Sequence, residues 1–137
     1  MEKILVLVFD THTIEDWLEF CMMTLQRFKP TTHILIPIDR HVIAHIASNE
    51  GVKEIEIRER LLHEAYLNLY HLEDIFSKRG SKVTIAAKEM TLPEELLGEI
   101  KKTNPEMLVV IGKIDTVVLE SLYGLLRMPI LLLPPGD

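Results

Sequence analysis

Residues 3–13 read KILVLVFDTHT, and this stretch decides the fold of the chain. Ile4 to Phe9 are all apolar, and a continuous apolar run is typical of a strand buried on both faces of a parallel sheet. After Asp10, apolar residues recur at steps of three and four, which indicates one face of an amphipathic helix. These residues are Ile14, Trp17, Leu18, Cys21, Met22, Leu25 and Phe28. The stretch therefore predicts a buried strand that leads directly into a helix.

The same alternation continues to the end of the chain. Further apolar runs predict strands at His33 to Ile38, Val83 to Ala87, Met107 to Ile111 and Ile130 to Leu133. Helical periodicity lies between them, and the order βαβαβαβαβ requires crossover connections. We therefore predict an α/β fold, an open five-stranded parallel sheet with helices on both faces in a Rossmann-like three-layer sandwich. No repeat or linker interrupts it, so residues 1–137 are expected to form a single domain.

Two capping boxes are predicted at helix starts. Thr13 and Asp16 fit the pattern at the start of the first helix. Thr91 and Glu94 fit it at the start of the helix predicted from Leu92 to about Thr103. Both helices are therefore expected to begin just after these threonines.

The connection from Asp39 to Gly80 is the longest, and only its second half has clear helical periodicity. Its expected buried stripe consists of Leu62, Ala65, Leu69, Leu72 and Phe76, and Gly80 is the expected left-handed C-cap. Residues 40–49 are expected to form a loop. A last helix is expected from about Thr116 to Leu126, with Val118, Leu119, Leu122 and Leu125 or Leu126 buried.

The composition indicates a soluble globular protein. Of the 137 residues, 47% are hydrophobic and 26% are charged. The formal net charge of -6 gives no basic surface for a nucleic-acid backbone, so DNA and RNA are not expected as partners. No apolar run approaches the roughly 20 residues that a membrane-spanning helix needs, and no export signal is visible. We therefore expect no association with a membrane.

The content of cysteine and glutamine bears on the cellular compartment and on the source organism. The single cysteine, Cys21, cannot form an internal disulfide, and on the apolar stripe of the first helix it is expected to behave as a small hydrophobe. A cytoplasmic location fits this pattern. Glutamate dominates the acidic residues and Gln26 is the one glutamine, a bias that indicates a thermophilic source.

Five segments carry a family resemblance. They are residues 3–10, the Arg79-Gly80 end of the long connection, Pro93 to Ile100, Pro105 to Gly112, and Met128 to Leu133. Through them the chain resembles the universal stress protein family over essentially its full length. The resemblance implies the adenine-nucleotide α-hydrolase-like version of the three-layer fold and a role in stress response or signalling.

The resemblance also implies where a nucleotide site would lie. Nucleotide-binding members of the family carry an Asp after the first strand that contacts adenine. After the fourth strand they carry a loop of Gly, two residues, Gly, nine residues, Gly and Ser or Thr, which holds ribose and phosphates. Asp10 matches the Asp and Gly112 the first glycine, but the remaining motif positions fall on Asp115, Leu125 and Leu126. Because a phosphate cradle needs closely approaching backbone N–H groups, and Asp115 would repel phosphate, we expect no ATP binding in the family's mode.

Two alternative functions stay open. The first is an ATP- or AMP-binding regulatory switch with a changed geometry. Its residues would be Asp10, Gly112 and Lys113, although Asp10 equally fits an ordinary helix cap. The second is a small enzyme of the adenine-nucleotide α-hydrolase-like group. Its residues would be His12, Asp39 and His41, and their clustering in one cleft would favour it.

Other site motifs are absent from the sequence. A Walker loop would need a glycine where Met107 stands, five residues before Gly112-Lys113. His41 and His45 have the helical spacing of two metal ligands, but no Glu lies between them in a zincin pattern and no Cys lies near. We therefore expect no metal site, no catalytic residues and no required cofactor.

The last predicted strand consists of the aliphatic residues Ile130, Leu131, Leu132 and Leu133. At a sheet edge such a strand must be paired or covered. Members of the resembled family commonly dimerise through this strand, which implies a symmetric homodimer with these four residues at the interface. Our prediction is a non-enzymatic stress-response or signalling protein that acts as a homodimer and meets a protein partner still to be identified.

Overall fold

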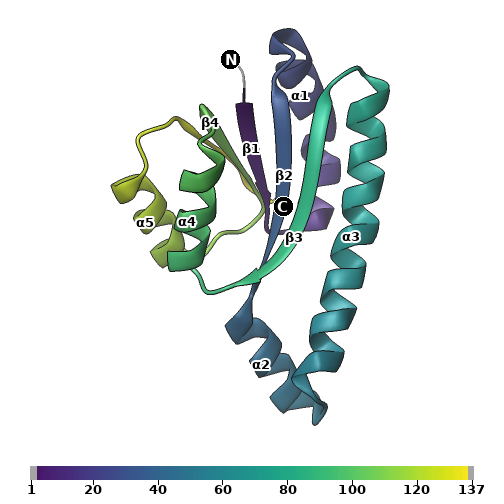
Figure 1. The fold of residues 1–137 in the computed structure, drawn as a ribbon, viewed down its shortest axis with the longest axis vertical. Helices are drawn as coiled ribbons and strands as arrows, with labels where there is room; N and C mark the ends of the chain where they lie inside the picture. Colours follow the sequence, from purple (N-terminus) through teal and green to yellow (C-terminus); the bar gives the residue numbers. More distant parts are fainter. Residues whose placement is uncertain (1–2, 136–137) are drawn as a thin grey trace.

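The computed structural model describes residues 3–135 (Figure 1). The elements, in chain order, are β1 (Lys3–Val8), α1 (Thr11–Phe28), β2 (Thr31–Asp39), α2 (Arg40–Glu50), α3 (Glu54–Lys78), β3 (Lys82–Met90), α4 (Glu94–Thr103), β4 (Met107–Ile111), α5 (Thr116–Leu125) and β5 (Ile130–Leu133). The predicted alternation of strands and helices is confirmed, with one helix more than the sequence indicated.

The strands form one five-stranded sheet in the order β3-β2-β1-β4-β5, and every neighbouring pair is parallel. The predicted fold class is therefore confirmed. The sheet is most deeply buried at its centre, where Ile4 to Val8 of β1 are all buried. Since β1 has a paired strand on each side and helices over both faces, a continuous apolar run is what its position requires.

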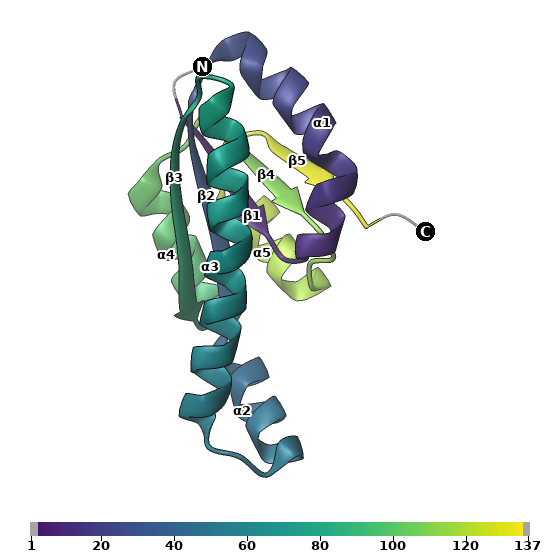
Figure 2. The same ribbon diagram turned by 90° about the vertical axis from the view of Figure 1, so that its right-hand side faces the viewer.

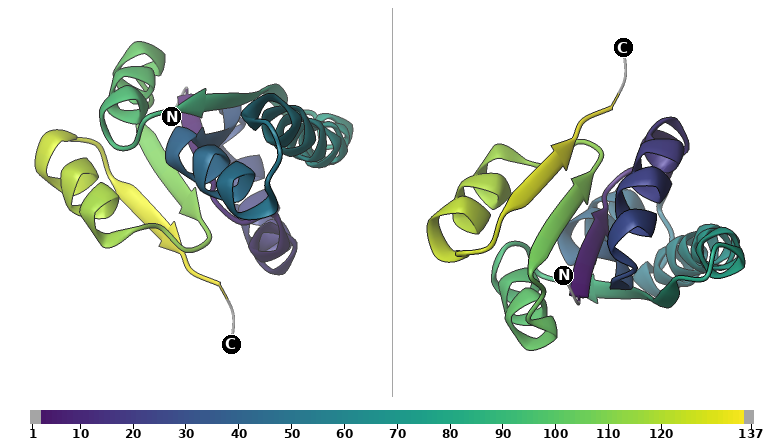
Figure 3. Two further views of the ribbon diagram at one scale, coloured as in Figure 1. Left: turned by 90° about the horizontal axis from the view of Figure 1, so that it is seen from below. Right: turned by 90° about the horizontal axis from the view of Figure 1, so that it is seen from above.

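Helices cover the sheet on two sides, so the molecule has three layers (Figure 3). Alternate residues of β1 point to opposite cores: Val6 packs with residues of α1, α2 and α3, and Leu7 packs with residues of α4 and α5. Burying one such side chain completely contributes about 1.5–3 kcal/mol. The helices of the first core are anchored by Ile14, Ile43 and Leu69, and those of the second by Leu96 and Leu122.

The prediction of a loop at residues 40–49 is wrong, because Arg40–Glu50 form helix α2. Asp39 caps its start, and Gly51, at φ 66°, ends it with an N–H bond to the carbonyl of Ala47. Ile43 and Ala47, four residues apart, supply its buried face. The helix was not predicted because its sequence mixes polar and apolar residues without a clear apolar face. Its stability comes from its two caps and from packing against α3.

Both predicted capping boxes are wrong as well. α1 begins at Thr11, and the buried Thr13 hydroxyl donates to the carboxylate of Asp10 instead of capping the helix itself. α4 begins at Glu94, with no side-chain cap bond at its N-terminus. The hydroxyl of Thr91 accepts a hydrogen bond from Arg40 instead. In both cases a residue outside the predicted capping box, Asp10 or Arg40, competes with the local pattern.

The long helix and the last helix agree better with their predictions. Along α3, Ala65, Leu69, Leu72 and Phe76 are buried and Leu62 is half-buried. Gly80 has φ 82° and its N–H donates to the carbonyl of Ser77, as expected after a helix end. In α5, Val118 and Leu122 are buried, Leu119 and Leu126 are half-buried, and Leu125 is exposed.

The stripe of α1 is confirmed where the structure describes it. Ile14 and Cys21 are buried and Trp17 is half-buried, whereas the predicted side chains of Leu18, Met22, Leu25 and Phe28 lie outside the described part. Burial raises the pKa of the Cys21 thiol to about 11. Cys21 is therefore a core residue, as its position on the stripe indicated.

α2 and the first turns of α3 extend beyond the sheet on the side where the strands end (Figure 2). α3 has 25 residues and starts at Glu54, well before the predicted periodic segment. The extended pair adds a wall to the carboxyl edge of the sheet, which is the edge where open parallel sheets bind ligands.

Candidate functional site

Helices α1, α2 and α5 begin at the carboxyl edge of the sheet, and an aspartate precedes each of them. Asp10 follows β1, Asp39 is the last residue of β2, and Asp115 ends the turn after β4. In each case Oδ1 accepts a hydrogen bond from the backbone N–H two residues later, at 2.8–2.9 Å. The positive ends of the three helix dipoles therefore already face carboxylates of the chain itself.

Both carboxylate oxygens of Asp10 accept a hydrogen bond from the first turn of α1. Oδ1 accepts from the N–H of His12 at 2.9 Å, and Oδ2 accepts from the Thr13 hydroxyl at 2.7 Å. The Thr13 bond first, and then the His12 bond, hold the pKa of the Asp10 carboxyl below its usual value. The capping role that the sequence offered for Asp10 is present. A contact of Asp10 with a nucleotide remains part of the nucleotide-switch alternative.

Gly112 lies where the ends of β1 and β4 approach most closely. Its φ is 103°, and a Cβ at this position would lie 2.8 Å from both the Cβ and the backbone nitrogen of Asp10. Its N–H donates to the carbonyl of Leu133 at 3.0 Å, and Phe9 N–H donates to the carbonyl of Ile111 at 2.8 Å. The chain therefore requires a glycine here for its own packing, whether or not a ligand binds.

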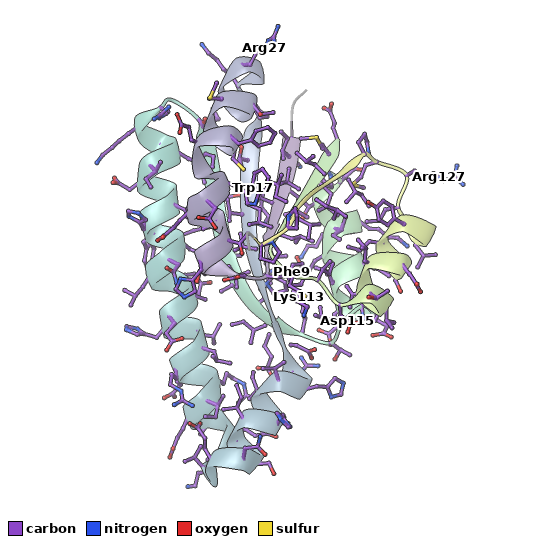
Figure 4. The ribbon with its side chains drawn as sticks, turned by 180° about the vertical axis from the view of Figure 1, so that it is seen from behind. Phe9, Trp17, Arg27, Lys113, Asp115 and Arg127 are labelled. Atoms are coloured by element: carbon purple, nitrogen blue, oxygen red, sulfur yellow. The ribbon has the colours of Figure 1, made fainter. Side chains whose placement is uncertain are left out.

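A cavity of about 420 Å³ opens beside these turns. Phe9, Lys113 and Asp115 lie together at this end of the sheet (Figure 4) and all line the cavity. Among the predicted residues, Lys113 and Asp39 also belong to its lining, and Asp10 and Gly112 do not. Its volume is within the range of about 300–1,000 Å³ that small-ligand pockets occupy.

The cavity walls are mainly apolar and come from both cores. Ile36, Ile38 and Leu61 contribute from the side of α3, and Leu92 and Val118 contribute from the side of α4 and α5. The polar lining residues are Thr11, Asp39, Glu64, Asn68, Lys113 and Asp115. Sequence reasoning missed the wall from α3. The acidic residues Glu54 and Glu56 in its first turn could have revealed where the helix begins, but not that it lines the cavity.

An ion-pair network lies at the neighbouring end of β3. Glu89 Oε1 accepts from Arg40 and Arg58 at 3.2 Å each, and Oε2 accepts a further bond from Arg58. Arg40 also donates to Glu95 at 2.9 Å. The bonds from Arg58 first, together with those from Arg40, lower the pKa of Glu89. The network fastens α2 and α3 to β3 and α4, and so holds the outer wall of the cavity in place.

Comparison of the whole chain with solved structures identifies its relatives in fold. The hypothetical protein MJ0577 matches at 17% identity and a TM-score of 0.72, covering 99% of this chain and 97% of that one. A universal stress protein family member from Burkholderia pseudomallei matches at 16% identity and a TM-score of 0.62, covering 97% and 96%. A family member from Arabidopsis thaliana, solved with AMP bound, matches at 13% identity and 0.60, covering 100% and 94%.

The chain has the fold of the universal stress proteins. No protein-family model matches its sequence, and no curated protein matches it either. The likeness therefore lies in the three-dimensional arrangement, and it spans almost all of both chains in these pairs.

The residues aligned with the last three positions of the glycine motif lie at the two ends of α5. Asp115 stands at the position of the second motif glycine and caps α5, which begins at the next residue. The third motif position, Leu125, is the last residue of α5, and Leu126 follows as its C-cap.

The residues of the enzyme alternative do not gather in one cleft. Asp39 lines the cavity, whereas His12 and His41 are exposed and do not line it. Within residues 3–135, no group of three or more His, Cys, Asp and Glu side chains is arranged to hold a metal ion. His45, the partner of His41 in the helical spacing, contacts Asn49 through its ring at 3.1 Å.

β5 is an edge strand, which is the position that the predicted dimer interface requires. Leu133 is buried, Ile130 and Leu131 are half-buried, and Leu132 is 36% exposed. The indole N–H of Trp17 donates to the carbonyl of Pro134 at 2.8 Å and holds the chain after β5 against α1. One side of β5 pairs with β4, and its other side carries backbone groups with no strand beside them in the described part of the chain. Among the described helices, none is long and apolar enough to cross a membrane.

Proposed function

We propose that the protein is a non-enzymatic, universal stress protein-like factor of stress response or signalling. It acts in the cytoplasm as a homodimer and does not bind ATP in the manner of the family's glycine loop. The observation that carries the second part is the Asp115 cap of α5, which stands where the motif glycine would be. A carboxylate at this helix start takes the N–H group that a phosphate would need, and it repels the phosphate charge.

Electrostatics at the rest of the edge supports the same conclusion. Asp10 and Asp39 cap the other two helices that begin there. Lys113 is the positive residue in the cavity lining, against three carboxylates, and it is exposed. A triphosphate would meet more negative than positive charge along this edge, which makes its binding unfavourable.

The second candidate is an ATP- or AMP-binding switch that uses Asp10, Gly112 and Lys113. Two observations favour it: the Arabidopsis thaliana protein with this fold was solved with AMP bound, and Lys113 lines a cavity large enough for a small ligand. A monophosphate carries less charge than a triphosphate, so AMP is the nucleotide that best fits this alternative.

One experiment separates the two candidates. Small molecules are released from the purified protein with acid, and ATP and AMP with magnesium are then titrated into it by calorimetry. The proposal expects no retained nucleotide and no heat. Micromolar binding that Asp10→Ala abolishes, while Asp74→Asn on the exposed surface of α3 leaves it intact, would establish the nucleotide switch instead.

The homodimer is tested at β5. Leu132 is partly exposed on the edge strand, so Leu132→Arg places a charge in the proposed interface and leaves the buried core in place. Light scattering coupled to size exclusion is expected to give a dimer for the parent chain and a monomer for this variant. The matched control is Leu67→Arg, at a 57% exposed leucine of α3, and it should stay dimeric. A monomeric parent chain at micromolar concentration would disprove the dimer.

A further inference from the structure

We infer that the cavity at the carboxyl edge is a binding site for a small organic cation with an apolar body. This inference deepens the proposed function, because it names the class of ligand that the same edge takes in place of a phosphate. Three features support it: apolar walls, an excess of carboxylates with unused acceptor oxygens, and helix ends that are already capped.

The apolar walls of the cavity indicate that the ligand has an apolar body. Phe9, Ile36, Ile38, Leu61 and Val118 contribute apolar surface from three separate elements and the turn after β1. Ile38 and Val118 belong to opposite cores, so the cavity spans the end of the sheet and is not a crevice in one core. An apolar ring or chain placed here would remove both its own surface and that of the walls from water.

The charged residues of the lining indicate that the ligand is positively charged. Asp39, Glu64 and Asp115 line the cavity, and Lys113 alone opposes them, which leaves a formal charge of −2 for the lining. Asp39 and Asp115 each use only Oδ1 for the helix cap, so Oδ2 of each has no hydrogen bond among residues 3–135. The Glu64 carboxylate likewise has no ion pair among these residues. Ammonium or amidinium N–H groups are the donors that such oxygens bind most strongly.

The helix ends do not reverse this preference. An anion at a helix N-terminus gains from unpaired N–H groups and from the dipole. In α2 and α5 one of these N–H groups, that of His41 or Val117, already donates to the carboxylate of Asp39 or Asp115. Lys113 remains as the one group that would attract an anionic ligand. Lys113, Glu64 and Asp115 are all exposed, so water screens their charges more than that of the half-buried Asp39.

The test uses two probes that share a ring and differ in charge. Tryptamine carries an ammonium group on an indole, and indole-3-acetate carries a carboxylate on the same ring. Each is titrated into the full chain by calorimetry at low ionic strength. We expect tryptamine to bind at least tenfold more tightly than indole-3-acetate. Equal affinities, or tighter binding of indole-3-acetate, would overturn the inference, as would the absence of binding by either probe at millimolar concentration.

Variants locate the site. Asn is nearly as good a helix cap as Asp, so Asp39→Asn and Asp115→Asn remove charge and preserve the helix starts. Each is expected to reduce the preference for tryptamine at least threefold. Asp74→Asn, the same change outside the cavity lining, should leave it unchanged. If the cavity variants behave like this control, the cation binds elsewhere and the inference fails.

The result is independent of the nucleotide titration. ATP or AMP binding through Asp10 would overturn the proposed function, whatever the order of the two indole probes. A lack of preference for tryptamine, with no nucleotide bound, would overturn this inference and leave the proposed function standing. The two outcomes can therefore be distinguished with one protein preparation.

Discussion

Replacing Gly112 by alanine should destabilise the protein by about 2–5 kcal/mol, and the value follows from two features of the structure. The first is the backbone, because at φ 103° an alanine is strained by about 1–2 kcal/mol. The second is steric, since the new methyl group would lie 2.8 Å from the Cβ and the nitrogen of Asp10. Overpacking of this kind costs about 1–3 kcal/mol. The neighbouring atoms include backbone, which cannot move aside as a flexible side chain can.

Urea unfolding followed by circular dichroism measures this loss. For a domain whose total stability is about 5–15 kcal/mol, the midpoint should fall clearly while the slope stays unchanged. Gly98→Ala is the matched control, because Gly98 is an exposed residue inside α4 with no atom within 4 Å of the added Cβ. Alanine there should stabilise the helix by up to about 1 kcal/mol. A loss below about 0.5 kcal/mol for Gly112→Ala would refute the packing argument and restore a ligand as the main reason for this glycine.

Three further predictions concern single side chains. Asp10→Ala should lower stability at pH 7 by about 1 kcal/mol through loss of the cap. Because the pKa of Asp10 is lowered in the fold, this contribution is present above the usual carboxyl pKa of about 4 and is lost as the pH falls through the lower folded value, so parent and variant should converge in acid. Cys21, with its pKa raised to about 11, should react with iodoacetamide at pH 8 about a hundredfold more slowly in the native chain than in urea, as mass spectrometry can measure. Glu89→Gln should lower the thermal midpoint at low salt, because Arg40 and Arg58 lose the negative charge that they share, and the difference from the parent should shrink at high salt.

The strands were predictable because continuous apolar runs are typical of strands that are buried on both faces. Ile4 to Val8 read as a continuous hydrophobic stretch because β1 lies at the centre of the sheet. The edge position of β5 could not be predicted in this way, because the order of strands in the sheet does not follow their order in the chain. Local signals for helix ends were less reliable, because the Thr13 and Thr91 hydroxyls each have a stronger partner, Asp10 and Arg40, than the cap that the sequence suggested.

α2 shows where periodicity alone fails. Its sequence is balanced between polar and apolar residues, so the helix has no strong apolar face, and only Ile43 and Ala47 are buried. The caps were visible in the sequence, with Asp39 before the segment and Gly51 after it, and both are used. Reading the caps first would have predicted the helix. The cavity wall from Leu61 and Glu64 could not have been predicted in this way, because it depends on the direction in which α3 leaves the sheet.

The caps also connect the fold of this chain to its choice of ligand. An aspartate placed after a buried strand caps the next helix by accepting one of its N–H groups. Asp10, Asp39 and Asp115 all have this role, and all three lie at the same edge of the sheet. Parallel topology brings these three positions together, since all the strands end on one side. The same bonds that fix the helix starts therefore concentrate negative charge where a ligand would enter. A chain that replaced Asp115 by glycine would give up a cap worth a few tenths of a kcal/mol to about 1 kcal/mol and would free an N–H group for an anion. The acidic cap at α5 is thus the residue on which the distinction between a phosphate site and a cation site depends.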